Sequence, residues 1–325
     1  MQNYSKIQKF LHDFVLSKKF INKSLFELEK IIYLKNNEIK NQNHIFITGL
    51  PRSGTTSLLN FIYSSENYAS LTYKNMPFIL SPNFSKLFYK KNIPMKERLH
   101  GDGITFDLNS PEALDEIFFD NEEKFIKNEM LNYIKLILIS ENKNKYLSKN
   151  NLNYKRINLI NSILPNSVFL ITIREPIQHA YSMLNQHFHF IKLQKENDFI
   201  RRYMNYLGHK EFGLNHTSWN KSVDFKDFNG INYWIEQWYL FYQNIFDRYQ
   251  SNNRCIFVVY EELTNSYYIE KLLNLINFNK EKNLSSNFFK NSNKDLLNID
   301  YSKSLKKFTS ELYNTFKTRS NFQKI

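Results

Sequence analysis

A pattern suited to binding a phosphate lies in residues 44–61, whose sequence is HIFITGLPRSGTTSLLNF. The apolar run 45–47 predicts a short buried strand, and Gly49 and Gly54 permit a sharp turn of the backbone after it. A helix beginning at Thr55 would direct its free N–H groups at an anion. The segment therefore predicts a strand, a tight loop and a helix that together form a phosphate cradle.

The cation of this loop is not where nucleotide triphosphatases have theirs. Their loops contain Gly, four residues and then Gly-Lys followed by Ser or Thr, and the Lys reaches the terminal phosphates. Here Gly49 and Gly54 have that spacing, but Thr55 stands at the Lys position and the cation is Arg52, inside the turn. A P-loop nucleotide kinase therefore stays open as an alternative that the loop disfavours.

A second candidate anion site lies in residues 165–187, whose sequence is PNSVFLITIREPIQHAYSMLNQH. The apolar run 168–173 predicts another buried strand that ends before Arg174, and Pro176 is well placed to begin a helix carrying Ser182. The guanidinium and the hydroxyl can converge on one phosphate through charge-assisted hydrogen bonds. The alternative is that Arg174 pairs with a surface acid and Ser182 is solvated.

Taken together, the two segments resemble the cofactor sites of sulfotransferases that use 3′-phosphoadenosine 5′-phosphosulfate (PAPS). The loop GLPRSGTT is similar to the 5′-phosphosulfate loop of bacterial and Golgi-type members, and Arg-x-Pro with a later Ser is similar to their 3′-phosphate site. The resemblance implies an α/β, P-loop-like sulfotransferase fold with a central, mostly parallel sheet flanked by helices. It implies the following cofactor-binding residues: Pro51, Arg52, Ser53, Gly54, Thr55, Thr56, Ser57, Arg174 and Ser182.

The resemblance covers residues 44–190 and 230–280 and leaves the ends of the chain uncovered. Residues 145–156 look like the Lys-containing strand and helix that precede the 3′-phosphate strand in the family. Apolar residues 256–260 predict a further strand, followed by a Tyr-Glu-Glu-Leu sequence of the kind that many sulfotransferases share.

The implied reaction is transfer of a sulfuryl group from PAPS to an acceptor hydroxyl or amine, which leaves 3′,5′-ADP. By analogy with phosphoryl transfer, the enzyme must position the reactants and stabilise charge growing on the leaving phosphate. Arg52 and the amides of residues 53–56 are expected to supply that stabilisation, with Lys149 as a further candidate near the sulfate. No metal is expected, because the sequence has no close His, Cys and Asp cluster with metal-ligand spacing. The expected acceptor is a bacterial glycan, a lipid-linked sugar or a small metabolite.

The general base is less clearly indicated. Several relatives with protein or carbohydrate acceptors carry a Glu shortly after the loop, where this chain has residues 73–76, Tyr-Lys-Asn-Met. The replacements that the sequence offers are His100, Asp102 and Glu112. An imidazole with a pKa of about 6.5 suits proton abstraction at neutral pH. In the alternative, His100 is structural and residues 110–112 begin a helix with an acidic first turn.

Polar and aromatic residues also gather in a segment after the second site. Residues 203–212 contain Gly208, His209 and Glu211, and His216 follows shortly after them. Such a segment can line an acceptor cleft, especially for a sugar, or form a solvated loop with one or two buried rings. The sequence leaves both interpretations open.

The composition fits one α/β domain. The chain has 325 residues, of which 42% are hydrophobic, and no Pro/Gly-rich linker divides it. We expect a single domain over residues 1–325, made of an N-terminal helical segment 1–43, a cofactor-binding core 44–280 and a C-terminal loop and helix 281–325.

Apolar periodicity predicts helices over residues 5–34, 122–140 and 231–249. The aromatic side chains of the last helix are expected in the core, although they resemble a sugar-stacking platform in type. The first helix carries an apolar stripe that favours core packing or a partner-facing helix over a membrane-surface anchor; its members are Ile7, Phe10, Leu11, Phe14 and Val15. The Asn- and Lys-rich stretches 140–156 and 279–298 are expected to be loops.

A formal net charge of +13 favours acidic partners. PAPS and many glycans are anionic, whereas the 44 Lys and Arg residues are dispersed and no nucleic-acid-binding signature is present. We therefore expect no nucleic-acid partner, and a non-catalytic anion or nucleic-acid binder remains as a third function class.

The sequence carries no signal for export or membrane insertion. It has one cysteine, Cys255, an N-terminus without an apolar leader, and no run close to the about 18 apolar residues of a membrane span. These features predict a cytoplasmic bacterial enzyme without a transmembrane segment; the oligomeric state is not indicated.

Overall fold

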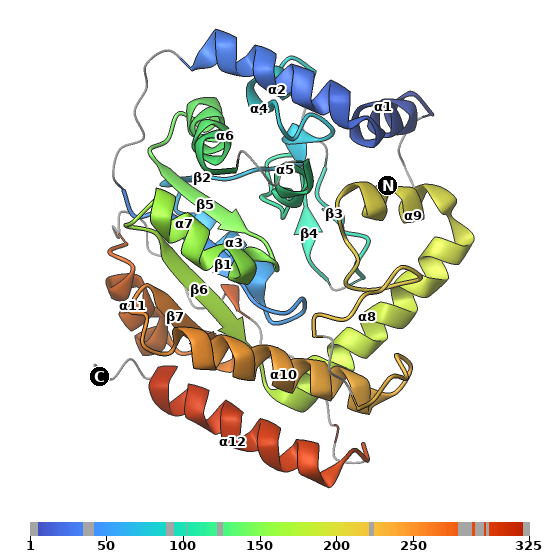
Figure 1. The fold of residues 1–325 in the computed structure, drawn as a ribbon, viewed down its shortest axis with the longest axis vertical. Coiled ribbons are helices and arrows are strands. Elements are labelled where there is room, and N and C mark those ends of the chain that lie inside the picture. The colour runs from blue at the N-terminus through green and yellow to red at the C-terminus, as the bar shows by residue number, and fades with distance from the viewer. Residues whose placement is uncertain are drawn as a thin grey trace.

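A parallel sheet with helices on both faces forms the centre of the molecule (Figure 1). The sheet order is β2-β5-β1-β6-β7, and every neighbouring pair runs parallel. The strands are β1 (Ile45–Thr48), β2 (Tyr68–Ala69), β5 (Lys145–Lys149), β6 (Val168–Ile173) and β7 (Cys255–Val259). The computed structural model describes residues 6–34, 42–88, 94–101, 103–121, 126–220, 224–278, 288–289, 296 and 299–320.

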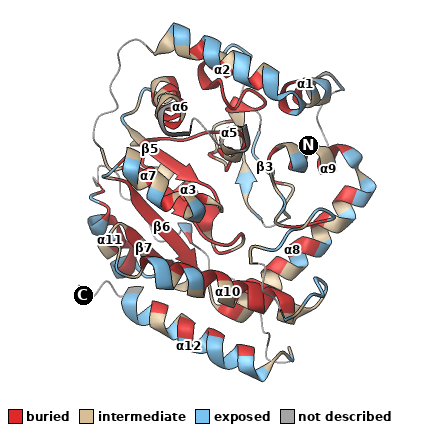
Figure 2. Ribbon diagram, in the orientation of Figure 1, coloured by how far each residue is buried: buried red, intermediate tan, exposed pale blue. Residues whose placement is uncertain are grey.

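The strands alternate their side chains between two hydrophobic layers, as extended backbone requires. Ile45 and Ile47 pack into one layer and Phe46 into the other, and Figure 2 shows the strands almost wholly buried. The first layer includes the helices α3 (Thr55–Tyr63) and α11 (Ser266–Leu275). The second includes α6 (Ile126–Glu141), α7 (Ile157–Ile163), α8 (Pro176–Glu196), α10 (Ile231–Tyr249) and α12 (Lys303–Ser320).

The remaining elements surround this centre. Two helices, α1 and α2, lie along the top of the view in Figure 1, and α1 packs against α9. The bounds are α1 (Lys6–Ser17), α2 (Lys19–Tyr33), α4 (Pro82–Ser85), β3 (Lys96–Glu97), β4 (Thr105–Phe106), α5 (Glu116–Asn121) and α9 (Asp198–Tyr206), with 3₁₀ turns at Tyr73–Asn75, Asn153–Arg156 and Tyr260–Thr264.

The α/β class, the parallel sheet and the strands of the two anion-site segments are confirmed. The helix predicted over residues 231–249 is α10, whose Trp234, Trp238 and Tyr242 are fully buried, so these aromatics are core. The helix predicted over 122–140 is confirmed from Ile126, since residues 122–125 lie outside the described residues.

The N-terminal segment is helical, but the predicted apolar stripe is only partly core. The chain breaks into α1 and α2 at Lys18, and Val15 is buried whereas Phe10 and Phe14 are 68% and 41% exposed. Contact between α1 and α9 buries the side of α1 that carries His12, which turns the two phenylalanines outward.

Two sequence-based predictions of local structure are wrong. Residues 140–156 are not one loop, because they contain β5, whose interior is buried between β1 and β2 despite its Lys- and Asn-rich flanks. The strand that the family resemblance implies in this segment is thereby confirmed. Residues 110–112 do not begin a helix: Pro111 forms a bridge with Thr72, and α5 begins at Glu116. The stretch 279–298 lies almost entirely outside the described residues.

A buried carboxylate fixes β5 to the surrounding elements. Asp115 accepts hydrogen bonds from Tyr133 of α6 (3.3 Å) and from Tyr146 (2.8 Å) and Ser148 (2.5 Å), which are two residues apart on strand β5. Burial raises the pKa of this carboxyl, and the three hydroxyl donors oppose that effect. The network holds in place β5, the strand that ends in Lys149.

We expect Asp115→Ala to lower the free energy of unfolding by about 3 kcal/mol or more, because it leaves three buried hydroxyls without their acceptor. Urea denaturation measures this difference directly. Asp247→Ala, at an exposed carboxylate on α10, is the control and is expected to change it by less than about 0.5 kcal/mol. A similar small loss for both variants would contradict the role given to Asp115.

Candidate functional site

The loop between β1 and α3 is a tight turn in which two glycines are required. Gly49 and Gly54 have φ values of +147° and +94°, which L side chains rarely adopt. A Cβ atom at Gly54 would lie 2.1 Å from Cδ2 of Tyr260, and one at Gly49 would lie 2.6 Å from Oγ1 of Thr172. Arg52 also has a positive φ of 75°, a strained conformation for a residue with a side chain.

Ser53 serves as the internal brace of this loop. Its N–H and its hydroxyl both donate to the carbonyl of Leu50, at 3.2 and 2.7 Å, and its Oγ lies 2.6 Å from Oγ1 of Thr172. The side chain is fully buried. Ser53 therefore shapes the cradle with groups that are already engaged inside the protein.

The first turn of α3 borders the cradle that this loop forms. Gly54 is the N-cap and has no side chain to satisfy the helix, and the first helical hydrogen bond runs from Leu58 N–H to Gly54 O at 3.0 Å. The amides of Thr55, Thr56 and Ser57 therefore have no acceptor within the helix. These amides, together with the positive end of the helix dipole, can bind an anion.

The two anion-site segments meet in space. Strands β1 and β6 are neighbours, with Thr48 in register with Ile171, so the residues that follow them lie side by side. Arg52 Nε donates to Ser182 Oγ at 3.2 Å, and Arg174 Nη1 donates to the carbonyl of Arg52 at 3.4 Å. The structure thus brings together Arg52, Arg174 and Ser182, which are far apart in the sequence.

Arg174 keeps a donor that the protein itself does not use. Its Nε is buried and has no hydrogen-bond partner among the residues that the structure describes. A buried guanidinium N–H without an acceptor costs free energy, which an anionic ligand would remove. Two arginines, a helix N-terminus and this unsatisfied donor fit a ligand that carries more than one phosphate or sulfate group.

Several residues that the sequence analysis missed hold the β6–α8 junction. Trp238 Nε1 donates to the carbonyl of Arg174 (3.1 Å), and Glu261 accepts from the N–H of Glu175 (2.9 Å).

His179 is fully buried and lies 2.8 Å from the carbonyl of Pro51, so its Nε2 must carry the proton. Burial, together with the charges of Arg174 and Arg52, lowers the pKa of His179 to about 3. His179 lies three residues before Ser182, and residues at this spacing share one helix face. This spacing was the sequence signal that could have placed His179 near the site.

A second cluster borders the start of α3. Arg98 Nη1 lies 3.4 Å from both Thr56 Oγ1 and Glu112 Oε2, and Tyr73 donates to the same Glu112 oxygen at 2.7 Å. Burial would raise the pKa of Glu112, but Lys149 and Arg98 outweigh it and lower this pKa to about 2. Because its oxygens are held by an ion pair and hydrogen bonds, Glu112 is better suited to orient Arg98 than to accept a proton.

The other two base candidates from the sequence have different outcomes. His100 lies near this cluster, since its charge contributes to the lowered pKa of Glu112, and its ring packs edge-on against Phe190. Asp102 lies outside the described residues.

A His–Glu pair from the segment after α9 approaches the same place. Nδ1 of His209 lies 3.4 Å from Oε2 of Glu211, and Asn151, just after β5, donates to the other carboxylate oxygen at 3.4 Å. Burial lowers the pKa of His209, but the Glu211 carboxylate outweighs burial and the net pKa is raised. Lys149 acts on both side chains electrostatically, so the pair lies beside the end of β5.

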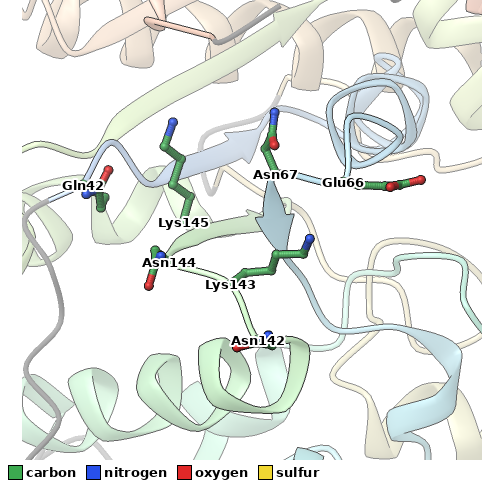
Figure 3. Close-up of a pocket in the computed structure, with 7 residues that line it drawn as sticks. All are labelled: Gln42, Glu66, Asn67, Asn142, Lys143, Asn144 and Lys145. Carbon is green, nitrogen blue, oxygen red and sulfur yellow. The ribbon is translucent and has the colours of Figure 1, made fainter. Parts of the chain in front are cut away.

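A cavity of about 270 Å³ lies elsewhere, near the amino end of β5 (Figure 3). It is lined by polar side chains, namely Gln42, Glu66, Asn67, Asn142, Lys143, Asn144 and Lys145. Since the anion loops follow the carboxyl ends of the strands, this cavity is at the opposite edge of the sheet.

Within the described ranges, no group of three or more His, Cys, Asp or Glu residues could hold a metal ion, and no helix is long and apolar enough to cross a membrane.

Comparison with known proteins identifies the family. Residues 44–268 match the model of the sulfotransferase family. The fold is similar to that of sulfotransferase STF1 from Mycobacterium tuberculosis H37Rv, with a TM-score of 0.52 and 10% identity over 94% of this chain and 87% of that chain. It is also similar to that of sulfotransferase STF9 from Mycobacterium avium, with a TM-score of 0.51 and 10% identity over 96% of this chain and 86% of that chain. No curated protein sequence gives a significant match. Because the family model covers more than half of its length, the chain belongs to the sulfotransferase family.

Proposed function

We propose that this sulfotransferase uses PAPS as its sulfuryl donor and transfers the group to an acceptor hydroxyl or amine, leaving 3′,5′-ADP. The observation that carries the proposal is the meeting of Arg52 and Arg174 at the ends of adjacent parallel strands. Two cations with separate hydrogen-bonding partners suit a nucleotide that carries anionic groups at both its 3′ and 5′ positions.

The donor site divides into two parts. Arg174, with its unused Nε donor, and Ser182 would hold the 3′-phosphate. The Oγ of Ser182 accepts from Arg52 Nε, and its own hydroxyl proton would be donated to that phosphate. Arg52 and the amides at the start of α3 would hold the 5′-phosphosulfate, where the helix dipole favours negative charge. Bound PAPS supplies the activated sulfuryl group, and the protein supplies position and charge stabilisation.

The acceptor side is proposed to lie between Lys149, His209 and Glu112. Lys149 would stabilise the charge shared by sulfate and leaving phosphate. His209, with Glu211 at its Nδ1, would accept the acceptor proton through Nε2, since Glu211 holds the ring in the tautomer that leaves Nε2 as a base. Glu112 would orient Arg98. We propose that the enzyme is cytoplasmic and bacterial and that its acceptor is a glycan, a lipid-linked sugar or a small metabolite.

The 3′-phosphate assignment predicts a selective loss of affinity. Arg174→Ala is expected to weaken binding of 3′,5′-ADP by about 2–4 kcal/mol, because a charge-assisted contact is removed, and to leave AMP binding unchanged. Isothermal titration calorimetry with both nucleotides measures this. Arg201→Ala, at an exposed arginine paired with Asp198, is the matched control and should affect neither ligand. Equal losses for 3′,5′-ADP and AMP would exclude the assignment.

The role of Arg52 predicts an effect on turnover rather than on affinity. Charge on the leaving phosphate is greatest in the transition state, so Arg52→Ala is expected to lower kcat by about 10²–10³-fold and to weaken 3′,5′-ADP binding far less. Radiolabelled sulfate transfer from PAPS to a panel of phenols, sugars and amines provides the rate. A variant whose kcat matches the wild type would show that Arg52 does not act on the leaving group.

The proposed base predicts a specific pH dependence. His209 must be neutral to accept a proton, so kcat/KM for a hydroxyl acceptor should rise with pH through a pKa above the usual 6.5. Glu211→Gln removes the carboxylate that raises this pKa and should move the rise to lower pH. His209→Gln is expected to lower kcat by about 10²-fold or more while 3′,5′-ADP affinity is kept.

His100→Gln is the comparison variant for this test, because His100 is the other histidine near the cluster. It is expected to keep the wild-type pH profile. If His100→Gln abolishes the rise and His209→Gln preserves it, the base is His100 and the assignment to His209 is incorrect.

A further inference from the structure

The outer faces of α1 and α2 expose an unusual amount of apolar surface. The two helices contribute six of the sixteen large apolar side chains that are exposed among the described residues. We call this set the α1–α2 face; it consists of Phe10 (68% exposed), Phe14 (41%), Phe20 (81%), Leu28 (49%), Ile31 (77%) and Ile32 (46%). In Figure 2 the outer side of α2 is largely pale blue. The rings of Phe10 and Phe14 stack with centres 6.0 Å apart, and clustered exposed apolar side chains mark an interaction site.

The helices are firmly attached through their inner sides. Glu29 is fully buried and accepts from the backbone N–H groups of Asn83 (2.9 Å) and Phe84 (3.1 Å). Phe26 packs edge-on against Phe118 and Tyr133 in the core. The outer face is therefore presented by an anchored pair of helices, and its exposure is not the result of loose packing.

Positive charge surrounds this face. Residues 6–34 contain six lysines, of which Lys6, Lys18, Lys19 and Lys23 are exposed. Lys9 is half-buried over the ring of Phe199, and Lys30 is held on the inner side by Glu129 at 2.7 Å. The three acids in the same span are already engaged: Glu29 is buried, Asp13 pairs with Arg202 at 3.1 Å and Glu27 pairs with Lys30 at 2.9 Å. Lys18 lies 4.9 Å from the ring centre of Phe14, so charge and aromatic surface are intermixed.

From this combination we propose that the α1–α2 face docks onto an anionic bilayer surface. Phenylalanine, leucine and isoleucine side chains would enter the boundary between headgroups and acyl chains, and the lysines would bind lipid phosphates. A protein partner fits less well, because the cores of protein interfaces are depleted in lysine. The docking is peripheral, with the helices lying in the plane of the interface.

Such docking would bring the acceptor side of the proposed active site close to the membrane. The inner side of α1 contacts α9 through His12 and Tyr203, whose ring centres are 6.0 Å apart, and through the Asp13–Arg202 pair. Helix α9 ends at Tyr206, three residues before His209. This consequence rests on the proposed function and favours a lipid-linked acceptor; the docking itself does not depend on it.

The test is co-sedimentation of the full chain with vesicles of phosphatidylcholine alone or mixed equally with phosphatidylglycerol. Binding to the mixed vesicles should be about tenfold or more tighter than to phosphatidylcholine and should weaken in high salt. The double variant Phe20→Ser, Ile31→Ser should lose about tenfold or more in affinity for the mixed vesicles. The single variant Leu275→Ser, at an exposed leucine on α11, is the control and should bind as the wild type does.

Thermal unfolding and 3′,5′-ADP calorimetry of each variant separate a loss of docking from a loss of folding or of the donor site. Absence of binding to the mixed vesicles, or equal binding by the wild type and the folded double variant, would overturn the proposal. So would a wild-type dimer that the double variant dissociates, because the face would then serve a second copy of the chain.

Discussion

The candidate site depends on bringing two arginines together at one edge of a sheet, where Arg174 Nη1 donates to the backbone carbonyl of Arg52 at 3.4 Å. Like charges repel, and a buried guanidinium N–H without an acceptor costs free energy, so the protein must hold this arrangement by other means. Adjacent parallel strands supply the placement, because β1 and β6 pair side by side up to Thr48 and Ile171 and the residues that follow them meet. Burial lowers the pKa of His179, and the positive charges of Arg174 and Arg52 add to that effect. Under the proposed function, a multiply anionic ligand would offset these two positive charges.

Most of the remaining structure around the site braces that edge. The aromatic face of α10 holds β6, since Trp238 and Tyr242 donate to the carbonyls of Arg174 and Thr172 at 3.1 and 2.8 Å. Glu261 links β7 to the start of α8 and is itself held by Tyr313 of α12 at 2.8 Å. The shared Tyr-Glu-Glu-Leu sequence after β7 therefore has a physical role: it fixes the backbone that carries Arg174. Helices that never approach the ligand still determine its site.

The sequence predicted those elements whose structure follows from a local residue pattern. It predicted less well the elements and side-chain pairs whose positions depend on long-range contacts. Gly49 and Gly54 signalled their turn because the positive φ values there admit few other residues, and Pro176 signalled the start of α8 because its fixed φ suits the first helical position. Strand β5 was partly hidden, since its burial comes from its neighbours β1 and β2 rather than from an apolar sequence. The pairing of His209 with Glu211 beside Lys149 could not be read from spacing alone, because it depends on how the segment after α9 folds back to β5.

The central claim is that the paired arginines form a donor site for a nucleotide with separate 3′ and 5′ phosphates. The most direct test is calorimetric binding of 3′,5′-ADP, AMP, ADP and magnesium-ATP to the wild-type chain at two salt concentrations. The account predicts selective binding of 3′,5′-ADP without metal at both salt concentrations. Preference for magnesium-ATP, or binding of none of the four nucleotides, would contradict it.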